Sequence, residues 1–282
     1  MAVDQATRLR ELAQSARSRA MVVAVTSGKG GVGKSNIALN LAAAAARAKR
    51  RVYLVDADLG LANLDLLCGV TPSCGLAEVV AGRRRLLDVA VRTPSGVNLI
   101  AGANGIAYLA DLPDEDRMRL LAGLQTLERE ADLIVIDTGA GISRNVIKVA
   151  AAADECLVVT TAEPTSITDA YAVLKLVSRE REHGAMSLVV NQADSAAHAE
   201  RIAARVMAVA RQFLKADVSY AGCVPSDPNL PRAVRSRMPV SQMFPSSASS
   251  VAISSLAGRY IKAGAVEESR GFISRLKSLV GR

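Results

Sequence analysis

Short runs of apolar, often β-branched residues alternate along this chain with longer segments that have the composition and spacing of helices. The apolar runs lie at residues 21–26, 51–56, 97–101, 132–137, 155–160, 187–191 and 217–224. They are almost uninterrupted, as is typical of parallel strands that helices cover on both faces. The helical segments lie at residues 34–49, 114–130, 143–152, 168–183 and 196–214. The pattern predicts an α/β fold with a doubly wound, mostly parallel sheet and helices on both faces.

Composition indicates one large domain with a short extension at each end. The chain has 282 residues, half of them apolar but only 3% aromatic, so Ala, Val, Ile and Leu must fill its core. We expect a domain over residues 21–264, an N-terminal segment over 1–20, and a linker with a terminal helix over 265–282. No apolar run approaches the ~20 residues of a membrane span, and the N-terminal segment lacks the apolar stretch of a secretory signal. A cytoplasmic protein is therefore expected.

A glycine-rich loop between the first strand and the first helix predicts a phosphate-binding site. Its sequence, GKGGVGKS, stands in the context that a P-loop requires. Glycines let backbone N–H groups turn toward phosphate oxygens, and the helix N-terminus adds partial positive charge. We expect Lys34 to bridge the β- and γ-phosphates of ATP, and Ser35 to offer its hydroxyl to Mg²⁺. The nucleotide-binding residues predicted here are Gly28, Lys29, Gly30, Gly31, Val32, Gly33, Lys34, Ser35 and Asn36.

Aspartates follow two further strands at the edge of the sheet where the P-loop is expected. Asp56 and Asp58 end the second strand, and Asp137 ends the strand at 132–137. We expect Asp58 to orient or activate the attacking water, Asp56 to support the Mg²⁺ shell, and Asp137 to act on Mg²⁺ directly or through water. Each carboxylate alone could be a helix cap or a solvated strand end. Their combination with the P-loop favours an ATP- and Mg²⁺-dependent catalytic site.

The second lysine of the loop, Lys29, is not needed by an ordinary P-loop. The pattern KGGVGKS resembles the deviant Walker A motif of the MinD/ParA/nitrogenase-iron-protein group. The resemblance implies an ATPase that dimerises on ATP, with Lys29 reaching the partner's nucleotide as an arginine finger would. It also implies that Asn191 reads the base and that Pro225 and Asp227 lie on the adenine side. A purely structural Asn turn is the alternative for Asn191.

Longer segments resemble one branch of that group, the flagellar-number regulators FlhG (also called FleN or YlxH). They are DLGLANLD at 58–65, DTGAGISRN at 137–145 and EPTSITDAY at 163–171. The resemblance implies a slow, partner-regulated ATPase switch controlling flagellar number or placement. C-ring components or a flagellar transcription regulator are further partners in such proteins.

The N-terminal sequence DQATRLR resembles the segment by which FlhG proteins engage and activate the flagellar SRP-type GTPase FlhF. The matching residues are Asp4, Gln5, Ala6, Leu9 and Arg10. From the residues alone, a frayed helix docked on its own domain is favoured over partner binding. The resemblance favours partner binding.

Charge is concentrated at the ends: residues 232–282 carry +7, residues 1–20 carry +2, and the body at 21–231 carries −1. Basic ends on a near-neutral body indicate an anionic partner such as a lipid surface, nucleic acid or an acidic protein. At 100° per residue the terminal helix gathers its apolar side chains into an arc of about 120°, with Arg270, Arg275 and Lys277 outside it. The arc consists of Phe272, Ile273, Leu276, Leu279 and Val280.

Such a helix suits the surface of a membrane, with its cations near anionic headgroups, and it also suits packing on its own domain. Residues 271–279 resemble the membrane-targeting helix of MinD-like proteins, which favours the membrane. An ATP-dependent homodimer would double the anchor, so membrane affinity would follow the bound nucleotide. We therefore expect peripheral association with the inner face of the cell membrane.

Three other functions fit the same fold. A ParA-like partition ATPase would bind DNA nonspecifically, but a DNA-binding arm needs no apolar stripe, which counts against DNA. A metal-cluster carrier is disfavoured because the four cysteines show no Cys-x-x-Cys spacing. A bacterial tyrosine kinase of this fold usually has a tyrosine-rich tail, and this tail has only Tyr260.

Overall fold

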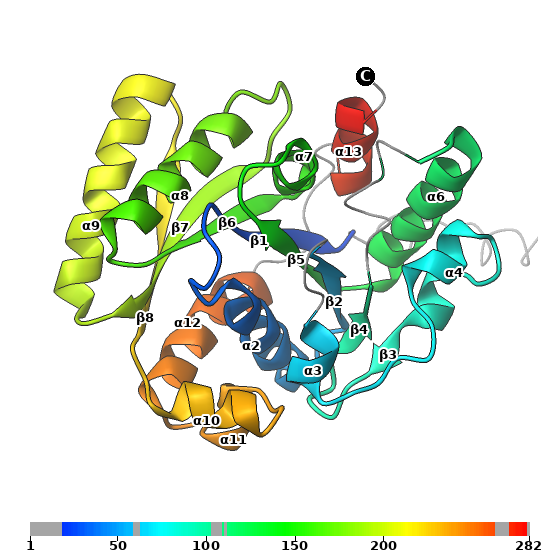
Figure 1. The fold of residues 1–282 in the computed structure, drawn as a ribbon, viewed down its shortest axis with the longest axis horizontal. Helices are drawn as coiled ribbons and strands as arrows, with labels where there is room; N and C mark the ends of the chain where they lie inside the picture. The colour runs from blue at the N-terminus through cyan, green and yellow to red at the C-terminus, as the bar shows by residue number, and fades with distance from the viewer. Residues whose placement is uncertain (1–18, 59–62, 103–108, 110–111, 263–270, 281–282) are drawn as a thin grey trace, which may run out of the picture.

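The computed structural model describes residues 19–58, 63–102, 109, 112–262 and 271–280, which form an eight-stranded sheet with helices on both faces (Figure 1). Across the sheet the order is β3-β4-β2-β5-β1-β6-β7-β8, and every neighbouring pair is parallel except β3 and β4. The strands are β1 (Met21–Ser27), β2 (Val52–Ala57), β3 (Val91–Arg92), β4 (Asn98–Ile100), β5 (Leu133–Ala140), β6 (Glu155–Thr160), β7 (Ala185–Ala193) and β8 (Val218–Pro225). The predicted fold class is confirmed.

The helices form two layers, one above and one below the sheet in Figure 1. The upper layer contains α4 (Leu76–Val80), η1 (Leu86–Val89), α6 (Asp114–Glu130), α7 (Arg144–Ala152), α8 (Pro164–Val177), α9 (Ala196–Val209) with the π-turn η2 (Ala210–Leu214), and α13 (Phe272–Val280). The lower layer contains α2 (Lys34–Arg47), α3 (Leu64–Cys68), α10 (Asn229–Arg235), α11 (Val240–Met243) and α12 (Ala248–Lys262). Each layer has its own apolar core against one face of the sheet.

The strand order places the predicted site. β5 lies between β1 and β2, so the ends of these three strands meet at one edge of the sheet. Asp137 of β5 is level with Val25 of β1 and with Asp56 of β2. The order reverses beside β1, where β6 lies on the other side, and such a reversal opens a crevice at the carboxyl ends of the strands.

Some predicted boundaries are wrong, and short elements were missed. The helix expected at 168–183 is α8, which begins four residues earlier because Pro164 occupies its first turn, and ends at Val177. The antiparallel strand β3 and the short helices α3, α4, α10 and α11 were not predicted. Elements of two to seven residues give too few positions for a period to be read. The residues Asp4, Gln5, Ala6, Leu9 and Arg10, and the linker at 265–270, lie outside the described residues.

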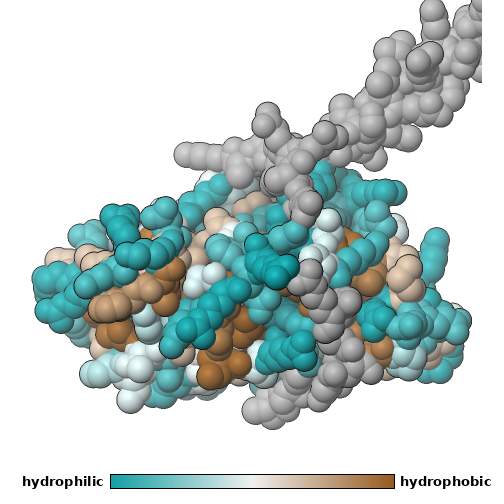
Figure 2. Space-filling view, turned by 90° about the horizontal axis from the view of Figure 1, so that it is seen from above, coloured by the Kyte–Doolittle hydropathy of each residue, from teal (hydrophilic) through white to brown (hydrophobic). Residues whose placement is uncertain are grey.

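The predicted C-terminal helix is present as α13, but the domain covers four side chains of its apolar arc. Phe272, Ile273, Leu276 and Leu279 are buried in the core that α6 and α7 share with the sheet. The face of the molecule seen from above shows hydrophobic side chains only in separated areas among hydrophilic ones (Figure 2). The alternative of packing on the domain therefore describes this structure, and insertion of the same side chains into a membrane requires the helix to leave its groove.

Arg275 was expected on the polar side of this helix, and that expectation is wrong. It is 8% exposed, and its Nε donates to the carbonyl of Ala152 over 2.8 Å while Nη2 donates to Asp154. Arg275 borders the apolar arc, so its aliphatic part packs with that arc while its guanidinium reaches buried acceptors. Within the described residues, no helix is both long and apolar enough to cross a bilayer.

Candidate functional site: a nucleotide pocket at the carboxyl ends of β1, β2 and β5

The P-loop joins β1 to α2 in a conformation that depends on two glycines. Gly33 caps α2 with φ +87°, and a Cβ there would lie 2.2 Å from the amide nitrogen of Asn191. A Cβ on Gly28 would lie 2.3 Å from the carbonyl oxygen of Asp169. Gly33 is required by its positive φ, which L-residues with side chains rarely adopt, and by the lack of space for a Cβ. Gly28 is required by the lack of space alone. The fold therefore presents the loop at the N-terminus of α2, as predicted.

Lys34 is the centre of the charged groups in the site. It is 6% exposed, and its Nζ lies 2.8 Å from Asp137 Oδ1 and 4.0 Å from Asp58 Oδ2. Burial raises the pKa of Asp137, although the ammonium of Lys34 opposes the rise. Three predicted catalytic or metal-binding residues thus come together from α2, β2 and β5.

Asp56 lies beside these groups but its oxygens face the backbone. They accept hydrogen bonds from the amides of Asp58 (3.2 Å) and Leu64 (3.3 Å). Burial raises the pKa of Asp56 to about 6, and the neighbouring Asp137 adds to the rise. Asp56 therefore ties together the two ends of the loop that carries Asp58, and its support of a Mg²⁺ shell stays a prediction.

Lys29 lies at the rim of the pocket with its side chain 41% exposed. Its Nζ is 2.6 Å from Glu163 Oε2 and 3.2 Å from Thr165 Oγ1, both at the start of α8. The lysine that was predicted to reach a second copy is thus paired within its own chain here. Glu163 is a partner that the sequence did not identify.

The three residues predicted on the base side have structural contacts of their own. Asn191 donates from Nδ2 to the Val32 carbonyl over 2.7 Å and so braces the P-loop from β7. Pro225 ends β8. Asp227 accepts from the Ser249 amide (2.9 Å), the Ser249 hydroxyl (2.7 Å) and the Asn229 amide (2.9 Å), which fastens the start of α12. Contacts of these residues with a base remain predictions.

The donor set fits Mg²⁺ held together with phosphates. Ser35 offers a hydroxyl that hydrogen-bonds the Asp137 carboxylate, and Asp137 lies beside the phosphate-binding loop. Mg²⁺ prefers oxygen ligands and is often held by one or two protein groups plus substrate phosphates. No cluster of three or more His, Cys, Asp or Glu side chains suited to a metal occurs in the part of the chain that the structure describes. Ser35 and Asp137 would therefore hold the ion only in company with the nucleotide.

Most of the P-loop, including Lys29, Lys34 and Ser35, lines a cavity of about 830 Å³ together with Asp58. The predicted site residues beyond the P-loop that do not line it are Asp56, Asp137, Asn191, Pro225 and Asp227. Its walls also include residues that sequence reasoning missed: Leu66 of α3, Val146 of α7, and Arg235 and Arg237 at the end of α10. The Arg-rich stretch RAVRSR after Asp227 was counted only toward the basic tail, because nothing in the sequence places α10 beside the P-loop. The exposed side chains of Leu66 (51%) and Ile142 (53%) border the same region.

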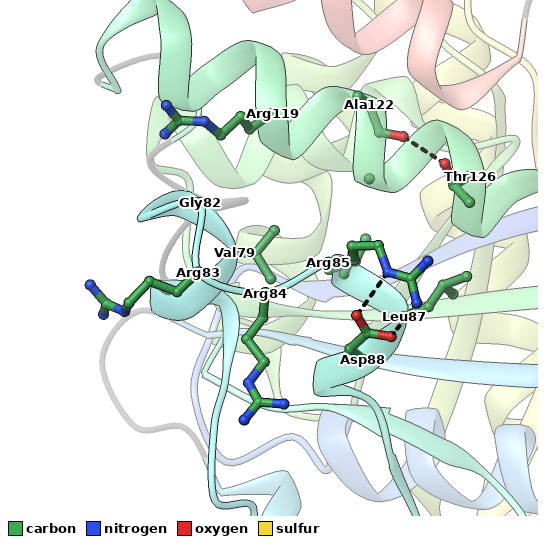
Figure 3. A pocket seen from close by; sticks show the side chains of 12 residues that line it. Val79, Gly82, Arg83, Arg84, Arg85, Leu87, Asp88, Arg119, Ala122 and Thr126 are labelled. Atoms are coloured by element: carbon green, nitrogen blue, oxygen red, sulfur yellow. Dashed lines mark hydrogen bonds and ion pairs between the residues drawn. The ribbon is translucent and has the colours of Figure 1, made fainter.

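A second cavity, of about 690 Å³, lies between α4, η1 and α6 and contains none of the predicted residues (Figure 3). Its arginines point in different directions, and three of them are paired with neighbouring carboxylates. Arg83 pairs with Glu78, Arg85 with Asp88, and Arg119 with Asp116. These cations do not converge on a common point, so we assign the chemistry to the P-loop cavity.

Comparison with known proteins agrees with this geometry. The CobQ/CobB/MinD/ParA nucleotide-binding domain matches residues 23–240, which hold the P-loop and all three aspartates. The chain belongs to this family. Within it, the chain is 40% identical to the antiactivator FleN of Pseudomonas aeruginosa over 236 residues, covering 84% of each chain. It is 31% identical to the flagellum site-determining protein YlxH of Helicobacter pylori, covering 92% of this chain and 90% of that one.

Solved structures of family members have the same fold. The MinD of Pyrococcus horikoshii complexed with Mg-ADP superposes with a TM-score of 0.70 at 25% identity, over 86% of this chain and 96% of that one. The cell division ATPase MinD of Pyrococcus furiosus gives 0.67 at 26% identity, over 84% and 97%. The predicted resemblance to MinD/ParA-type ATPases and to the FleN/YlxH branch is confirmed.

Proposed function

We propose that this protein is an ATP-hydrolysing switch that dimerises on ATP and regulates flagellar number or placement. The observation that carries the proposal is the convergence of Lys34, Asp58 and Asp137 at the end of a P-loop that also has Lys29 at its rim. The flagellar part rests on the similarity to FleN and YlxH over most of both chains.

In the reaction, water attacks the γ-phosphate of ATP and yields ADP and phosphate. Lys34 exchanges its contact with Asp137 for phosphate oxygens, which neutralises charge on the transferred group. Asp137 and Ser35 would hold Mg²⁺, which would supply positive charge to the phosphates, and Asp58 would orient the attacking water. The cavity opens to solvent beside Lys29, which leaves room for a second protein surface to complete the site.

A second copy of the chain is the proposed occupant of that opening. Lys29 is partly exposed there, Leu66 is an exposed apolar side chain of the cavity wall, and Ile142 is exposed between the lining residues Ala140 and Ser143. In this proposal, bound phosphate draws Lys29 away from Glu163. Only then can the second copy contact this face of the molecule. Dimerisation would thereby depend on ATP.

Membrane association through α13 is the part of the proposal that needs a conformational change. Four apolar side chains of α13 are buried against the domain, so the docked helix offers little to a lipid surface. Release of the helix would expose them together with the basic residues of the C-terminal region. We propose that ATP-dependent dimerisation and membrane binding are coupled in this way, and that residues 1–20 engage an SRP-type GTPase of the FlhF kind.

The decisive experiment combines the molecular mass of the protein in solution with the flagellar number of cells that express it. Light scattering on the full chain should show a dimer with ATP and Mg²⁺ and a monomer with ADP, while Lys29→Ala stays monomeric with either. Lys175→Ala, which removes a lysine from α8 away from the pocket, is the matched control and should dimerise. Expression in Pseudomonas aeruginosa cells that lack FleN should restore the flagellar number with the natural chain but not with Lys34→Ala. A wild-type chain that binds ATP but never dimerises would refute the switch.

A further inference from the structure

The two ends of the described chain meet at one buried carboxylate. Arg19, where residues 1–18 join the fold, donates from Nη1 and Nη2 to Asp154 Oδ2 and Oδ1 over 2.7 and 2.8 Å. Arg275 of α13 donates from Nη2 to the same Oδ1. The amide of Val22 donates to Oδ2 over 2.9 Å. Asp154 itself stands in the short turn between α7 and β6, far from both ends in sequence.

A second carboxylate, Glu128 of α6, joins the same pair of ends. Its Oε1 accepts from the amide of Phe272, the first residue of α13, over 3.1 Å and lies 3.5 Å from Arg19 Nη1. The Ala20 amide donates to the backbone carbonyl of Glu128 over 2.8 Å. Two carboxylates and two guanidiniums therefore balance in charge, and we call Arg19, Glu128, Asp154 and Arg275 the junction.

The junction is mostly buried, which makes its members depend on one another. The exposed fractions of the four side chains are 16% (Arg19), 9% (Glu128), 7% (Asp154) and 10% (Arg275). Burial alone would raise the pKa of Asp154, but hydrogen bonds from Arg19, Val22 and Arg275 outweigh it and hold that pKa below its usual value. Removing one cation would leave two buried carboxylates sharing a single positive partner, which costs far more than losing a surface pair.

Backbone packing adds a direct contact between the ends. A Cβ on Gly271, the residue before α13, would lie 2.8 Å from Glu128 Oε1 and 3.1 Å from Cδ of Arg19. The start of α13 thus covers the Arg19 side chain and shields its ion pair from water. Undocking of α13 would hydrate that pair, and a hydrated pair is much weaker.

We propose that the junction couples the two ends of the chain, so that displacing the N-terminal segment at Arg19 loosens α13 and undocking α13 loosens Arg19. The coupling is reciprocal because each end stabilises carboxylates that the other also uses. Its use rests on the proposed function: a partner that pulls residues 1–20 away would free the C-terminal helix for a lipid surface without touching it.

Hydrogen exchange on the full chain in solution tests the coupling directly. Arg19→Gln should speed exchange of the α13 amides by roughly five- to 150-fold, the range of typical coupling between two sites. Amides of β5 and β6 should keep their protection and so report that the fold is intact. Arg85→Gln removes an arginine from an exposed pair on η1 and should leave α13 unchanged.

The reverse direction uses variants at the other end. Arg275→Gln, and the milder Gly271→Ala, should speed exchange of the Ala20 and Met21 amides while the sheet centre stays protected. Effects in both directions support the junction. Unchanged α13 exchange in Arg19→Gln, or unchanged Ala20 exchange in both C-terminal variants, would overturn it. Neither membrane nor GTPase nor nucleotide enters the measurement, so its failure is distinct from failure of the proposed function.

Discussion

The carboxyl-end edge and the amino-end edge of the central sheet use their charged side chains in opposite ways. At the carboxyl ends of β1, β2 and β5, Lys34 has carboxylates at 2.8 and 4.0 Å, and Lys29 and Asp58 keep 41% and 25% of their side chains exposed. At the amino ends, Asp154 accepts four hydrogen bonds from Arg19, Val22 and Arg275 and is 7% exposed. Glu155 likewise accepts from Tyr260 (3.0 Å) and Arg259 (3.2 Å) of α12.

The difference distinguishes a ligand-binding site from a structural attachment point. A carboxylate whose two oxygens are both occupied by protein donors has little left for a ligand, so Asp154 serves to hold α13 to the sheet. Glu155 holds α12 through Oε1 in the same way. At the other edge Lys34 and Lys29 have few partners and themselves line a cavity, so phosphate can replace those partners. Charge alone did not distinguish the two edges; the degree of hydrogen-bond saturation did.

The largest expected effect is on catalysis at the open edge. Asp58→Ala should keep ATP binding but slow phosphate release by about 10²–10⁴-fold, the usual loss when a group acting on the reacting water is removed. The trapped ATP state should accumulate as a dimer, which light scattering detects. Phosphate release at the normal rate would contradict the role given to Asp58.

Removing a carboxylate at the amino-end edge of the sheet should lower the free energy of unfolding instead of the catalytic rate. Asp154→Ala leaves two buried guanidiniums without their shared acceptor, and breaking such an arrangement costs about 3–5 kcal/mol. Urea denaturation of wild type and variant measures this loss. Arg51 and Asp132 form an exposed pair on the same side, and Asp132→Ala is the control, with a loss of about 1 kcal/mol or less. Equal losses for both variants would remove the contrast between buried and exposed carboxylates.

Asp227 gives a smaller effect with a defined pH dependence. Burial raises the pKa of Asp227, but hydrogen bonds from Ser249 and Asn229 outweigh it and hold that pKa at about 2, below the ordinary 3.8. Its carboxylate therefore stabilises the fold above about pH 4, and this contribution disappears as the pH falls toward 2. Asp227→Asn should cost about 1 kcal/mol near pH 6, after allowance for screening at this partly exposed site. Denaturation curves should show that the difference in free energy of unfolding between wild type and Asp227→Asn decreases toward pH 3.

The smallest expected effect concerns the rim lysine. Lys29 and Glu163 are a largely exposed pair, and such pairs contribute about 0.2–1 kcal/mol. Glu163→Ala should free Lys29 and lower the ATP concentration needed for half-maximal dimerisation by about 1.4- to fivefold, the same free energy expressed as a ratio. A shift in the other direction would mean that Glu163 assists dimerisation rather than holding Lys29 back.

Much of the site was predictable because its chemistry is local in sequence. The glycines, Lys34 and Ser35 are adjacent, and Asp56, Asp58 and Asp137 each end a recognisable apolar run. Glu163 lies in the segment EPTSITDAY, just before α8, but nothing in the sequence indicates that its carboxylate pairs with Lys29. Arg235 and Arg237 stand at the end of α10, and nothing close to them in sequence places that helix beside the P-loop.

The amphipathic pattern of α13 shows a second limit of prediction from sequence. Periodicity predicted a helix with one apolar face, and such a helix is present. It could not tell whether protein or lipid covers that face, because both offer an apolar surface of the same width. Only the groove between α6 and α7, and the carboxylates Glu128 and Asp154 at its end, decided in favour of docking.

The α/β class, the strand before each predicted site aspartate, the P-loop and the family could be read from the sequence, because they depend on residues close together along the chain. The tertiary structure decided the strand order that puts β5 between β1 and β2, the pairing of Lys29 with Glu163, and the meeting of both ends at Asp154. Those features join residues up to 135 positions apart. The energy that fixes them comes from burial and hydrogen-bond saturation in three dimensions, which a linear pattern does not record.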